Sequence, residues 1–468
     1  MFDFEIISHW AQVQGKELAY ADESSEITFR DLDSITRKIA FLLNEKGIKQ
    51  GELVATILPP QLGWLCTFAL HRLGITTMSK NNLSGFNKEA TPDWLISLLP
   101  HNQIPQDRTI IFDQAYFDLI KATEEMQALP GYSSPDVIAR LFSTSGTTGD
   151  VKYIDRTAGQ LAEFSTLNAS YDFAGTDHIM SLFPYGAGQT YRLALKCLLQ
   201  GKPYFNCSFP DYRLPKVLSK YPIRTLIGSP AQIAGFLDIQ KQTATSLPLI
   251  KTVIMGGSVP SKQLVDRILS QLDCRVFNAY GSSEALNIAN QEITQSVEGG
   301  ATLNPEVNLQ IVDENDVPLA PLNVGRIRYQ RPGMATSYYK NLAASAEFFK
   351  SGFFYPGDLA YIDETGKLVL DGRVNEVINL GGVKINPEAV DKIALAQLGV
   401  LDCATFASFD ETGVEQLAIA LVVDGDFNSE LFTKAMEAKS PNKPKAYVQV
   451  TEIPRNENGK ILRHKLRL

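Results

Sequence analysis

Residues 137–152 read VIARLFSTSGTTGDVK, an apolar run followed at once by a loop of hydroxyl side chains and glycines and then by a lysine. Of the seven loop positions 143–149, five carry hydroxyl groups and two are glycine. Glycines let backbone N–H groups approach an anion, hydroxyls add hydrogen-bond donors, and Lys152 brings a positive charge. The pattern predicts a strand that ends in a polyphosphate-binding loop, with an ordinary polar turn as the alternative.

Two common nucleotide-binding motifs do not fit this chain. A Walker A loop needs a lysine directly after its second glycine, whereas two residues separate Gly149 from Lys152 here. Residues 186–191 (GAGQTY) begin like a dinucleotide-binding fingerprint but lack its final glycine. The sequence therefore disfavours a P-loop NTPase and gives little support to a nicotinamide enzyme.

Apolar runs and helix-length segments alternate around the loop. A capping box at 28–31 precedes apolar residues at helical spacing, and Gly47 stands where a helix C-cap belongs. A strand is predicted at 53–58 and a second helix at 62–73, which Gly74 ends. This rhythm predicts an α/β fold of parallel sheets covered by helices. Further short apolar runs lie at 109–112, 137–142, 179–183, 225–227, 253–255 and 276–277.

Several of these runs end in turns rich in glycine or hydroxyl residues. The turns lie at 143–149, 228–229, 256–258 and 280–281. In open α/β sheets ligands bind beyond the carboxyl ends of the strands. We therefore expect these turns to share one crevice.

Composition and charge exclude other classes of protein. The chain has 468 residues, 44% of them hydrophobic, with 44 basic and 52 acidic side chains and a net charge of −8. This profile excludes collagen, coiled coil and wholesale disorder, and it argues against general affinity for nucleic acid. The five cysteines are scattered without a CxxC pair, which suggests neither a disulfide framework nor a zinc site. With no apolar stretch of roughly 18 residues and no signal-peptide pattern, we expect a cytoplasmic protein without a membrane span.

A domain boundary is predicted near Gly372 and Arg373, after a strand pair with a turn at 363–366. It would divide the chain into an N-terminal domain, 1–372, and a smaller C-terminal domain, 373–468. Residues 439–468 carry eight basic and two acidic side chains, a net charge of +6, so the remainder carries −14. Such a cluster either faces a polyphosphate or forms a solvated charged surface.

The loop at 143–152 resembles the phosphate-binding signature of the adenylate-forming superfamily, which includes acyl-CoA synthetases, the adenylation domains of nonribosomal peptide synthetases and beetle luciferases. Further segments are similar to that family's motifs and occur in the family's order. They are 278–284 (NAYGSSE), 331–334 (RPGM), 357–359 (GDL), 372–373 (GR) with 381–388 (GGVKINPE), and 458–461 (NGKI). The resemblance implies a large N-terminal domain of helix-covered sheets and a smaller, mobile α+β C-terminal domain.

The same resemblance implies an AMP-forming acid-thiol ligase. A carboxylic acid attacks the α-phosphorus of Mg-ATP to give an acyl adenylate and pyrophosphate, and a pantetheine thiol then takes the acyl group and releases AMP. ATP and Mg²⁺ are the implied cofactors, and the acceptor is either CoA or the phosphopantetheine of an acyl carrier protein. Two alternatives remain: an enzyme that stops at acyl-AMP, and a nucleotide-binding relative that has lost turnover.

Roles for individual residues follow from the matched motifs. Lys460 would neutralise charge at the α-phosphate, Ser283 would lie near that phosphate, and Glu284 and Thr148 would bind magnesium. The nucleotide would be held by the phosphate loop and by the motifs after it: Thr144, Ser145, Gly146, Thr147, Thr148, Gly149, Lys152, Gly257, Asn278, Ala279, Tyr280, Gly281, Asp358 and Arg373. Within this set Tyr280 is expected against adenine and Asp358 on the ribose hydroxyls. Arg373 is expected to reach the ribose and phosphates, with a structural salt bridge as its alternative.

The acid substrate is only partly specified. Amino-acid-activating relatives carry an aspartate for the substrate's ammonium group, but residues 183–186 read FPYG, which disfavours an α-amino acid. The expected pocket residues at 184–188, 229–231 and 256–259 are mostly small and apolar and suit an apolar acyl or aryl tail. The chain departs from the family at Val151, where proline is usual, and at Asn375, where an acidic or lysine hinge residue is common.

Overall fold

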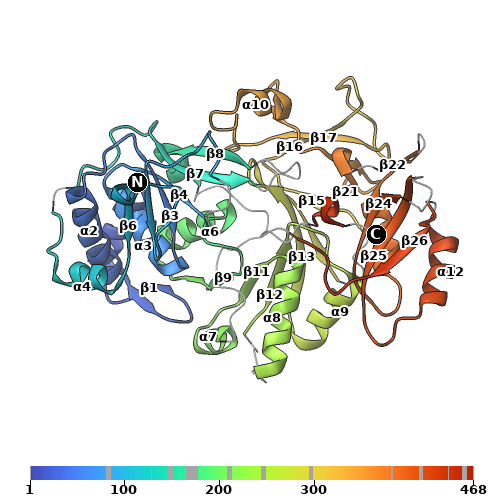
Figure 1. Ribbon diagram of the computed structural model, residues 1–468, viewed down its shortest axis with the longest axis horizontal. Helices are drawn as coiled ribbons and strands as arrows, with labels where there is room; N and C mark the ends of the chain where they lie inside the picture. The colour runs from blue at the N-terminus through green and yellow to red at the C-terminus, as the bar shows by residue number, and fades with distance from the viewer. Residues whose placement is uncertain are drawn as a thin grey trace.

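The computed structural model describes residues 2–80, 86–127, 129–144, 151–164, 178–207, 213–243, 249–294, 299–376, 378–380, 383–409, 415–440, 442–455 and 461–466. In these residues the strands form sheets of nine, six, six, three and two members, with helices packed around them (Figure 1). This is the α/β class that the alternation predicts.

The nine-stranded sheet runs through the middle of the molecule. In spatial order its strands are β15 (Thr302–Leu303), β14 (Leu286–Ile293), β13 (Arg275–Ser282), β12 (Thr252–Gly256), β11 (Thr225–Gly228), β9 (Ile179–Ser181), β10 (Tyr204–Asn206), β1 (Leu18–Ala21) and β2 (Glu26–Thr28). All neighbours from β13 across to β1 are parallel. The connecting helices are α6 (Gly188–Leu199), α7 (Leu214–Lys220), α8 (Pro230–Thr243) and α9 (Lys262–Gln271). The parallel strands therefore present their carboxyl ends on one edge.

A six-stranded sheet of the N-terminal part holds the strand of the predicted phosphate loop. Its order is β6 (Thr109–Ile111), β5 (Trp94–Ser97), β3 (Leu53–Ile57), β4 (Thr76–Ser79), β7 (Ile138–Thr144) and β8 (Lys152–Thr157). Only the β7–β8 pair is antiparallel. The helices of this part of the chain are α1 (Asp3–Gln14), α2 (Phe29–Glu45), α3 (Pro60–Arg72), α4 (Gln114–Ala122) and α5 (Ala158–Phe164), besides the short helix η1 (Gln106–Arg108).

Helix α2 shows how local sequence produces these elements. The Thr28 side chain accepts a hydrogen bond from the N–H of Asp31 and so caps the helix, as the capping box predicts. Leu32, Ile39 and Leu43 are buried on one face. They belong to a large apolar cluster that also includes side chains of α3, α6 and strands from both sheets, so the helices join the two sheets into one core.

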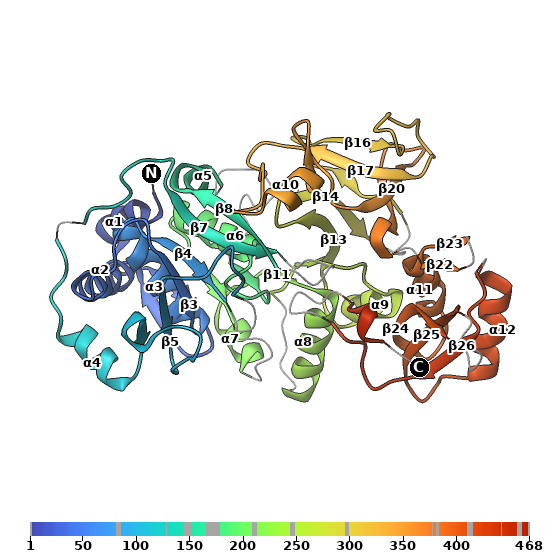
Figure 2. The same cartoon turned by 45° about the horizontal axis from the view of Figure 1, so that its top comes forward.

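The second six-stranded sheet is antiparallel throughout. It contains β16 (Asn308–Val312), β17 (Gly325–Gln330), β18 (Phe349–Lys350), β19 (Phe353–Phe354), β20 (Asp358–Ile362) and β21 (Leu368–Arg373), with helix α10 (Leu342–Phe348) beside it. The predicted turn at 363–366 joins β20 to β21. Figure 2 shows this sheet at the top of the molecule, between the two large sheets and the C-terminal part.

The C-terminal part forms a compact α+β unit at one end of the molecule (Figure 1). Its elements are η2 (Val374–Glu376), β22 (Ile378–Leu380), β23 (Val383–Ile385), α11 (Pro387–Leu395), β24 (Val400–Phe409), β25 (Glu415–Val423), α12 (Ser429–Lys439), β26 (Ala446–Gln449) and η3 (Arg463–Lys465). Its two apolar clusters contain only residues from 378 onward. The division into a large N-terminal and a small α+β C-terminal part is therefore as predicted, while the boundary at 372 and 373 stays a prediction.

Most predicted elements are present, but the sequence did not indicate which strands share a sheet. β7 belongs to the N-terminal six-stranded sheet, whereas β9, β11, β12 and β13 belong to the nine-stranded sheet. Strands β1 and β10 were not predicted, because each is only three or four residues long and pairs with strands that are distant in sequence, including each other. Among the described residues, no helix is long and apolar enough to cross a membrane.

The N-cap of α2 can be tested by substitution of Thr28. We expect Thr28→Ala to lower the free energy of unfolding by about 1 kcal/mol, because one N–H of the first turn loses its acceptor. Thr28→Ser keeps the hydroxyl acceptor, so its free energy of unfolding should lie within a few tenths of a kcal/mol of the wild-type value. Urea denaturation of the three proteins measures the difference, and equal stability of the two variants would contradict the capping role.

Candidate active site

The predicted phosphate loop joins two antiparallel strands. Ser143 faces Tyr153 and Thr144 faces Lys152 across the β7–β8 pair, so the loop begins and ends at neighbouring residues. Thr144 is buried. The predicted loop residues Ser145, Gly146, Thr147, Thr148 and Gly149 lie outside the described residues. The structure thus brings together the two ends of the loop, Thr144 and Lys152.

The adenine-side residues lie at the carboxyl ends of β12 and β13. Met255 is paired with Asn278 and Gly256 with Ala279, so the turn after β12 adjoins the last residues of β13. Gly257 has a φ of +91°, which a side chain would strain. The structure therefore places Gly257, Asn278, Ala279 and Tyr280 together on one sheet edge.

A tight turn between β13 and β14 carries Ser283 and Glu284. A side chain at Gly281 would meet the carbonyl oxygen of Leu286 at 2.1 Å, so only glycine fits. Leu286 itself has a φ of +64°, an uncommon conformation for this residue type. The turn leaves Ser283 exposed, while Glu284 is buried with only 8% of its surface accessible.

Glu284 is held by three groups from distant parts of the chain. The Tyr338 hydroxyl donates to Oε1 of Glu284 at 2.8 Å. The Glu284 carbonyl oxygen accepts from the N–H of Ala335 at 2.7 Å and from the guanidinium of buried Arg156 at 3.3 Å. Burial lowers the pKa of Arg156 to about 10, although Asp155 and Glu284 act in the opposite direction. The guanidinium is therefore still charged at neutral pH.

Asp358 lies at the junction of the strand ends and the antiparallel sheet. It faces Arg373 across the β20–β21 pair, and Nε of Arg373 lies 2.9 Å from its Oδ1. The Tyr280 hydroxyl donates to Oδ2 at 2.5 Å. Burial raises the pKa of Tyr280, and the charge of Asp358 raises it further, so the phenol stays protonated. The salt bridge that was the alternative for Arg373 is present, and its partner is the carboxylate expected to bind ribose.

These contacts bring Tyr280, Asp358 and Arg373 together, and Tyr338 contacts both Glu284 and Lys152. The chain matches the family described as AMP-binding enzyme over residues 7–339. It belongs to that family.

Individual relatives are full-length matches at low identity. The chain is 24% identical to 4-chlorobenzoate--CoA ligase of Arthrobacter sp, covering 99% of this chain and 94% of that ligase. It is 25% identical to 2-succinylbenzoate--CoA ligase of Listeria innocua, and the match covers 98% of this chain and 99% of that ligase. Its fold matches o-succinylbenzoate CoA synthetase of Bacillus subtilis, solved with the acyl-adenylate intermediate OSB-AMP, with a TM-score of 0.82 over 99% of this chain and 98% of that one at 19% identity.

Lys460, which the sequence analysis predicts to act at the α-phosphate, lies outside the described residues. The residues flanking it are well anchored. Arg455 pairs with Ile461 in an antiparallel bridge, and its guanidinium forms an ion pair with Asp402 at 2.8 Å. Arg463 forms an ion pair with Asp391 at 2.6 Å. The described residues on each side of Lys460 are therefore fixed to the C-terminal unit.

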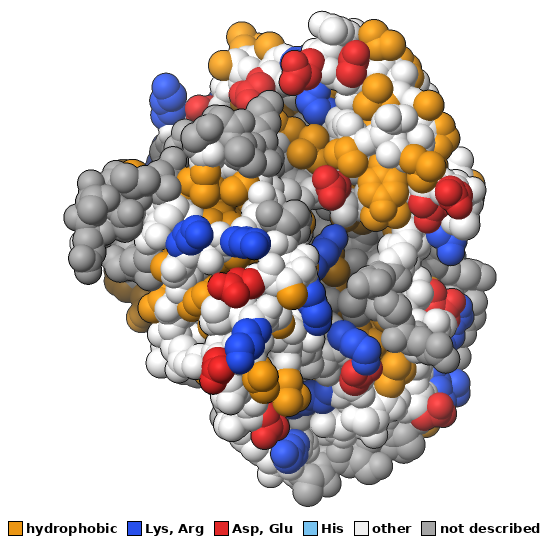
Figure 3. Space-filling model, turned by 90° about the vertical axis from the view of Figure 1, so that its right-hand side faces the viewer, with side chains coloured by type: hydrophobic (Ala, Val, Ile, Leu, Met, Phe, Trp, Pro, Cys, Tyr) orange, Lys and Arg blue, Asp and Glu red, His pale blue; other side chains and the backbone are white. Residues whose placement is uncertain are grey.

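The basic C-terminal stretch has two kinds of side chain. Arg455 and Arg463 are engaged in ion pairs, whereas Lys443, Lys445 and Lys465 are exposed. Figure 3 shows Lys and Arg side chains gathered near the centre of this end of the molecule, with acidic side chains between them. Part of the positive charge is therefore structural and part of it is a solvated surface.

Two residues that support the turn and strand around Glu284 had no role in the sequence interpretation. Tyr338 contacts Glu284 although 54 positions separate them. Arg331, quoted within a family motif, is buried and donates to the carbonyl oxygen of Asn287 at 2.6 Å, bracing the strand that follows Glu284. No spacing rule links either residue to Glu284, because the contacts arise from the packing of two sheets.

Glu284 also fits the expected magnesium chemistry. Within the described residues no cluster of three His, Cys, Asp or Glu side chains could hold a metal ion, so a protein-only metal cage is not formed there. A buried carboxylate with one oxygen fixed by a phenol suits a cation that is shared with nucleotide phosphates and water, as magnesium sites commonly are.

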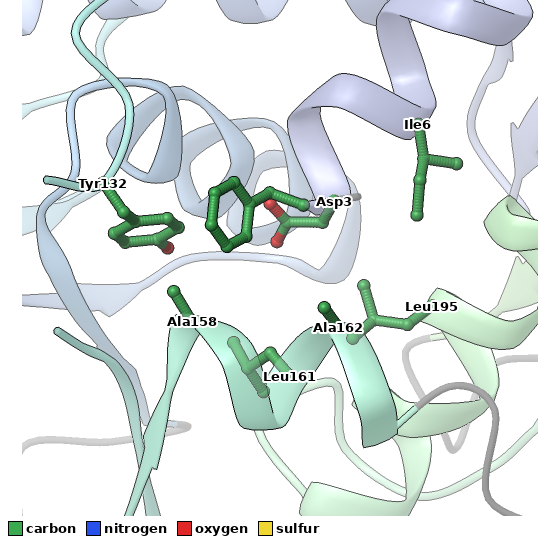
Figure 4. A pocket seen from close by; sticks show the side chains of 8 residues that line it. Asp3, Ile6, Tyr132, Ala158, Leu161, Ala162 and Leu195 are labelled. Atoms are coloured by element: carbon green, nitrogen blue, oxygen red, sulfur yellow. The ribbon is translucent and has the colours of Figure 1, made fainter. Parts of the chain in front are cut away.

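A small pocket lies away from these residues (Figure 4). It is lined by Phe2, Asp3, Ile6, Tyr132, Ala158, Leu161, Ala162 and Leu195. The Asp3 carboxylate is bonded to Nδ1 of His71 at 2.6 Å and to the hydroxyl of Tyr191 at 3.1 Å. Most of the lining belongs to the large apolar cluster, and the Asp3 carboxylate is already hydrogen-bonded. The buried Tyr132 hydroxyl, which also lines the pocket, has no hydrogen-bond partner among the described residues.

The Asp3 contacts have a consequence for stability. Burial alone raises the pKa of Asp3, but His71 and the hydrogen bonds to its carboxylate lower it by more. A carboxyl with a lowered pKa stabilises the fold above its unfolded value of 3.8, and this contribution is lost as pH falls through the lowered folded value. We expect Asp3→Asn to lower the free energy of unfolding by about 2 kcal/mol at pH 7, with the deficit narrowing in acid.

Denaturation of wild type and variant at pH 7, 5 and 3 measures this deficit. The exposed Asp118, which pairs with Lys121 on the surface, provides the control substitution Asp118→Asn. A deficit of the same size at every pH would contradict an ionised Asp3 in the folded protein.

Proposed function

We propose that this protein activates a carboxylic acid with ATP and then transfers the acyl group to a thiol. The observation that carries the proposal is the placement of Asp358, Glu284 and the two ends of the phosphate loop around one edge of the nine-stranded sheet. The family membership and the names of the CoA ligases that resemble the chain support the same reaction.

Different residues would bind different parts of the nucleotide. The strand ends at Gly257 and Tyr280 would receive adenine, and Asp358 would accept bonds from the ribose hydroxyls while Arg373 holds its carboxylate. Thr144 and Lys152 would hold the phosphates at the base of the loop. Magnesium, when bound with ATP at Glu284, neutralises phosphate charge. Lys460 would stabilise the charge that develops as the acid attacks the α-phosphorus.

The proposed substrate is an aromatic or otherwise apolar acid of moderate size. Phe183 and Tyr185 are buried and belong to the same apolar cluster as Ile227, Ile254 and Leu286. These side chains follow or precede the strand ends that form the nucleotide site, so an acid bound among them would lie near the α-phosphate. The relatives named above act on chlorobenzoate and succinylbenzoate, which are aryl acids.

CoA is the proposed acceptor, and a carrier protein's phosphopantetheine is the alternative. The C-terminal unit would rotate between the two steps, about a hinge near the predicted boundary. We also propose a cytoplasmic location, which is supported by the five cysteines, all of them described and none of them in a disulfide.

Pyrophosphate exchange into ATP tests the first step. A panel of benzoates, succinylbenzoate, medium-chain fatty acids and α-amino acids should give exchange with one or more aryl or apolar acids and none with amino acids. Thioester formation is then measured with CoA and with a phosphopantetheinylated carrier protein. ATP binding by folded protein without exchange for any acid would favour a nucleotide-binding protein without turnover.

Substitution of Lys460 tests the proposed adenylation step most directly. Lys460→Ala should lower the exchange rate by about two to three orders of magnitude while changing ATP affinity little, because the charge acts mainly in the transition state. The exposed Lys465 in the same tail offers the control variant Lys465→Ala. Near-normal exchange by Lys460→Ala would mean that another cation serves the reaction.

A further inference from the structure

The segment between β17 and α10 connects the two halves of the candidate site. The N–H of Ala335 donates to the Glu284 carbonyl at 2.7 Å, and the N–H of Tyr339 donates to the Tyr153 carbonyl at 2.7 Å. One bond reaches the turn that carries Glu284, and the other reaches the strand that begins at Lys152. Both ribbon views show α10 beside β8 (Figure 1 and Figure 2).

Tyr338 lies between these two backbone contacts. Its side chain is 5% exposed, and its hydroxyl donates to Oε1 of Glu284 at 2.8 Å. Its ring centroid lies 5.8 Å from Nζ of Lys152, and the ring of Phe348 lies 5.0 Å from the same nitrogen. The two rings pack edge to face at 5.9 Å. A single phenol therefore contacts the metal-binding carboxylate through its oxygen and the phosphate-loop lysine through its face.

The phenol hydroxyl is the donor in this hydrogen bond, and Oε1 of Glu284 is the acceptor. Within the described residues, Oε2 of Glu284 accepts no hydrogen bond. The contact thus engages one carboxylate oxygen and leaves the other available.

We propose that Tyr338 is a positioning residue for the metal–nucleotide complex. Its hydroxyl holds Glu284 so that Oε2 is the oxygen offered to the cation, and its ring, together with that of Phe348, holds the ammonium of Lys152 at the base of the phosphate loop. This inference rests on the proposed function only in that the site binds Mg-ATP.

The two parts of the side chain have separable effects. Without the hydroxyl, the Glu284 carboxylate must be ordered when the cation binds, which weakens Mg-ATP more than metal-free ATP. Without the ring, Lys152 loses the face that orients it, which weakens both forms of the nucleotide. A residue with only a structural role would change both affinities equally and lower the melting temperature as well.

Calorimetric titration with Mg-ATP, and with ATP in EDTA, distinguishes these outcomes. Tyr338→Phe should weaken Mg-ATP about tenfold, as expected for a lost hydrogen bond to a charged group, and leave metal-free ATP within about twofold. The neighbouring Tyr339 provides the control, because its hydroxyl makes no hydrogen bond among the described residues. Tyr339→Phe should match wild type in both titrations.

A double-mutant cycle measures the coupling between Tyr338 and Glu284 in Mg-ATP binding. In a Glu284→Gln background the substitution Tyr338→Phe should have less than a third of its effect on Mg-ATP affinity, because the charge that the hydroxyl positions is gone. Tyr338→Leu should add a loss of metal-free ATP affinity.

Unchanged Mg-ATP affinity in Tyr338→Phe, or equal losses with and without the metal, would overturn the inference. These titrations need no acid substrate. Failure of pyrophosphate exchange with every acid would therefore refute the proposed reaction while leaving the role of Tyr338 to be decided by binding.

Discussion

The site depends on two carboxyl groups that are held inside the protein. Glu284 and Asp358 are 8% and 6% exposed, and a buried charge is tolerated only when it is paired or hydrogen-bonded. Each carboxylate accepts a hydrogen bond from a tyrosine hydroxyl, Glu284 from Tyr338 and Asp358 from Tyr280. Asp358 also has the guanidinium of Arg373. For Glu284 the phenol engages one oxygen, whereas both oxygens of Asp358 are engaged, Oδ2 by the phenol and Oδ1 by the guanidinium.

The supporting contacts come from three sheets, which explains why the site needs so much of the chain. β13 of the nine-stranded sheet carries Tyr280, β20 of the antiparallel sheet carries Asp358, and β8 of the N-terminal sheet begins at Lys152. The segment between β17 and α10 binds the turn after β13 and the start of β8 through backbone bonds. Displacement of one sheet against another would therefore separate groups that must meet a single nucleotide.

Local features of this arrangement were predictable from the sequence, whereas the pairing of distant segments was not. The capping box at Thr28 and the apolar spacing of α2 are properties of neighbouring residues, and the structure confirms both. The family motifs likewise identify Glu284 and Asp358 as site candidates. Tyr338 has no comparable signal, because its contact with Glu284 depends on where the segment after β17 crosses the turn after β13. Nor does the sequence indicate that β7 lies in a different sheet from β9, β11, β12 and β13, because strand pairing depends on residues far apart in the chain.

The register of β20 and β21 bears on where a rotation of the C-terminal unit can begin. Arg373 faces Asp358 in that pair, so it belongs to the antiparallel sheet rather than to the unit that follows. Glu376, three positions later, forms an ion pair with Arg463 of the C-terminal tail at 3.3 Å. A rotation that preserves both ion pairs must take place within η2 (Val374–Glu376), the short helix between them. The ribose-side carboxylate would then keep its guanidinium partner throughout, while Glu376 and Arg463 would move together with the segment that carries Lys460.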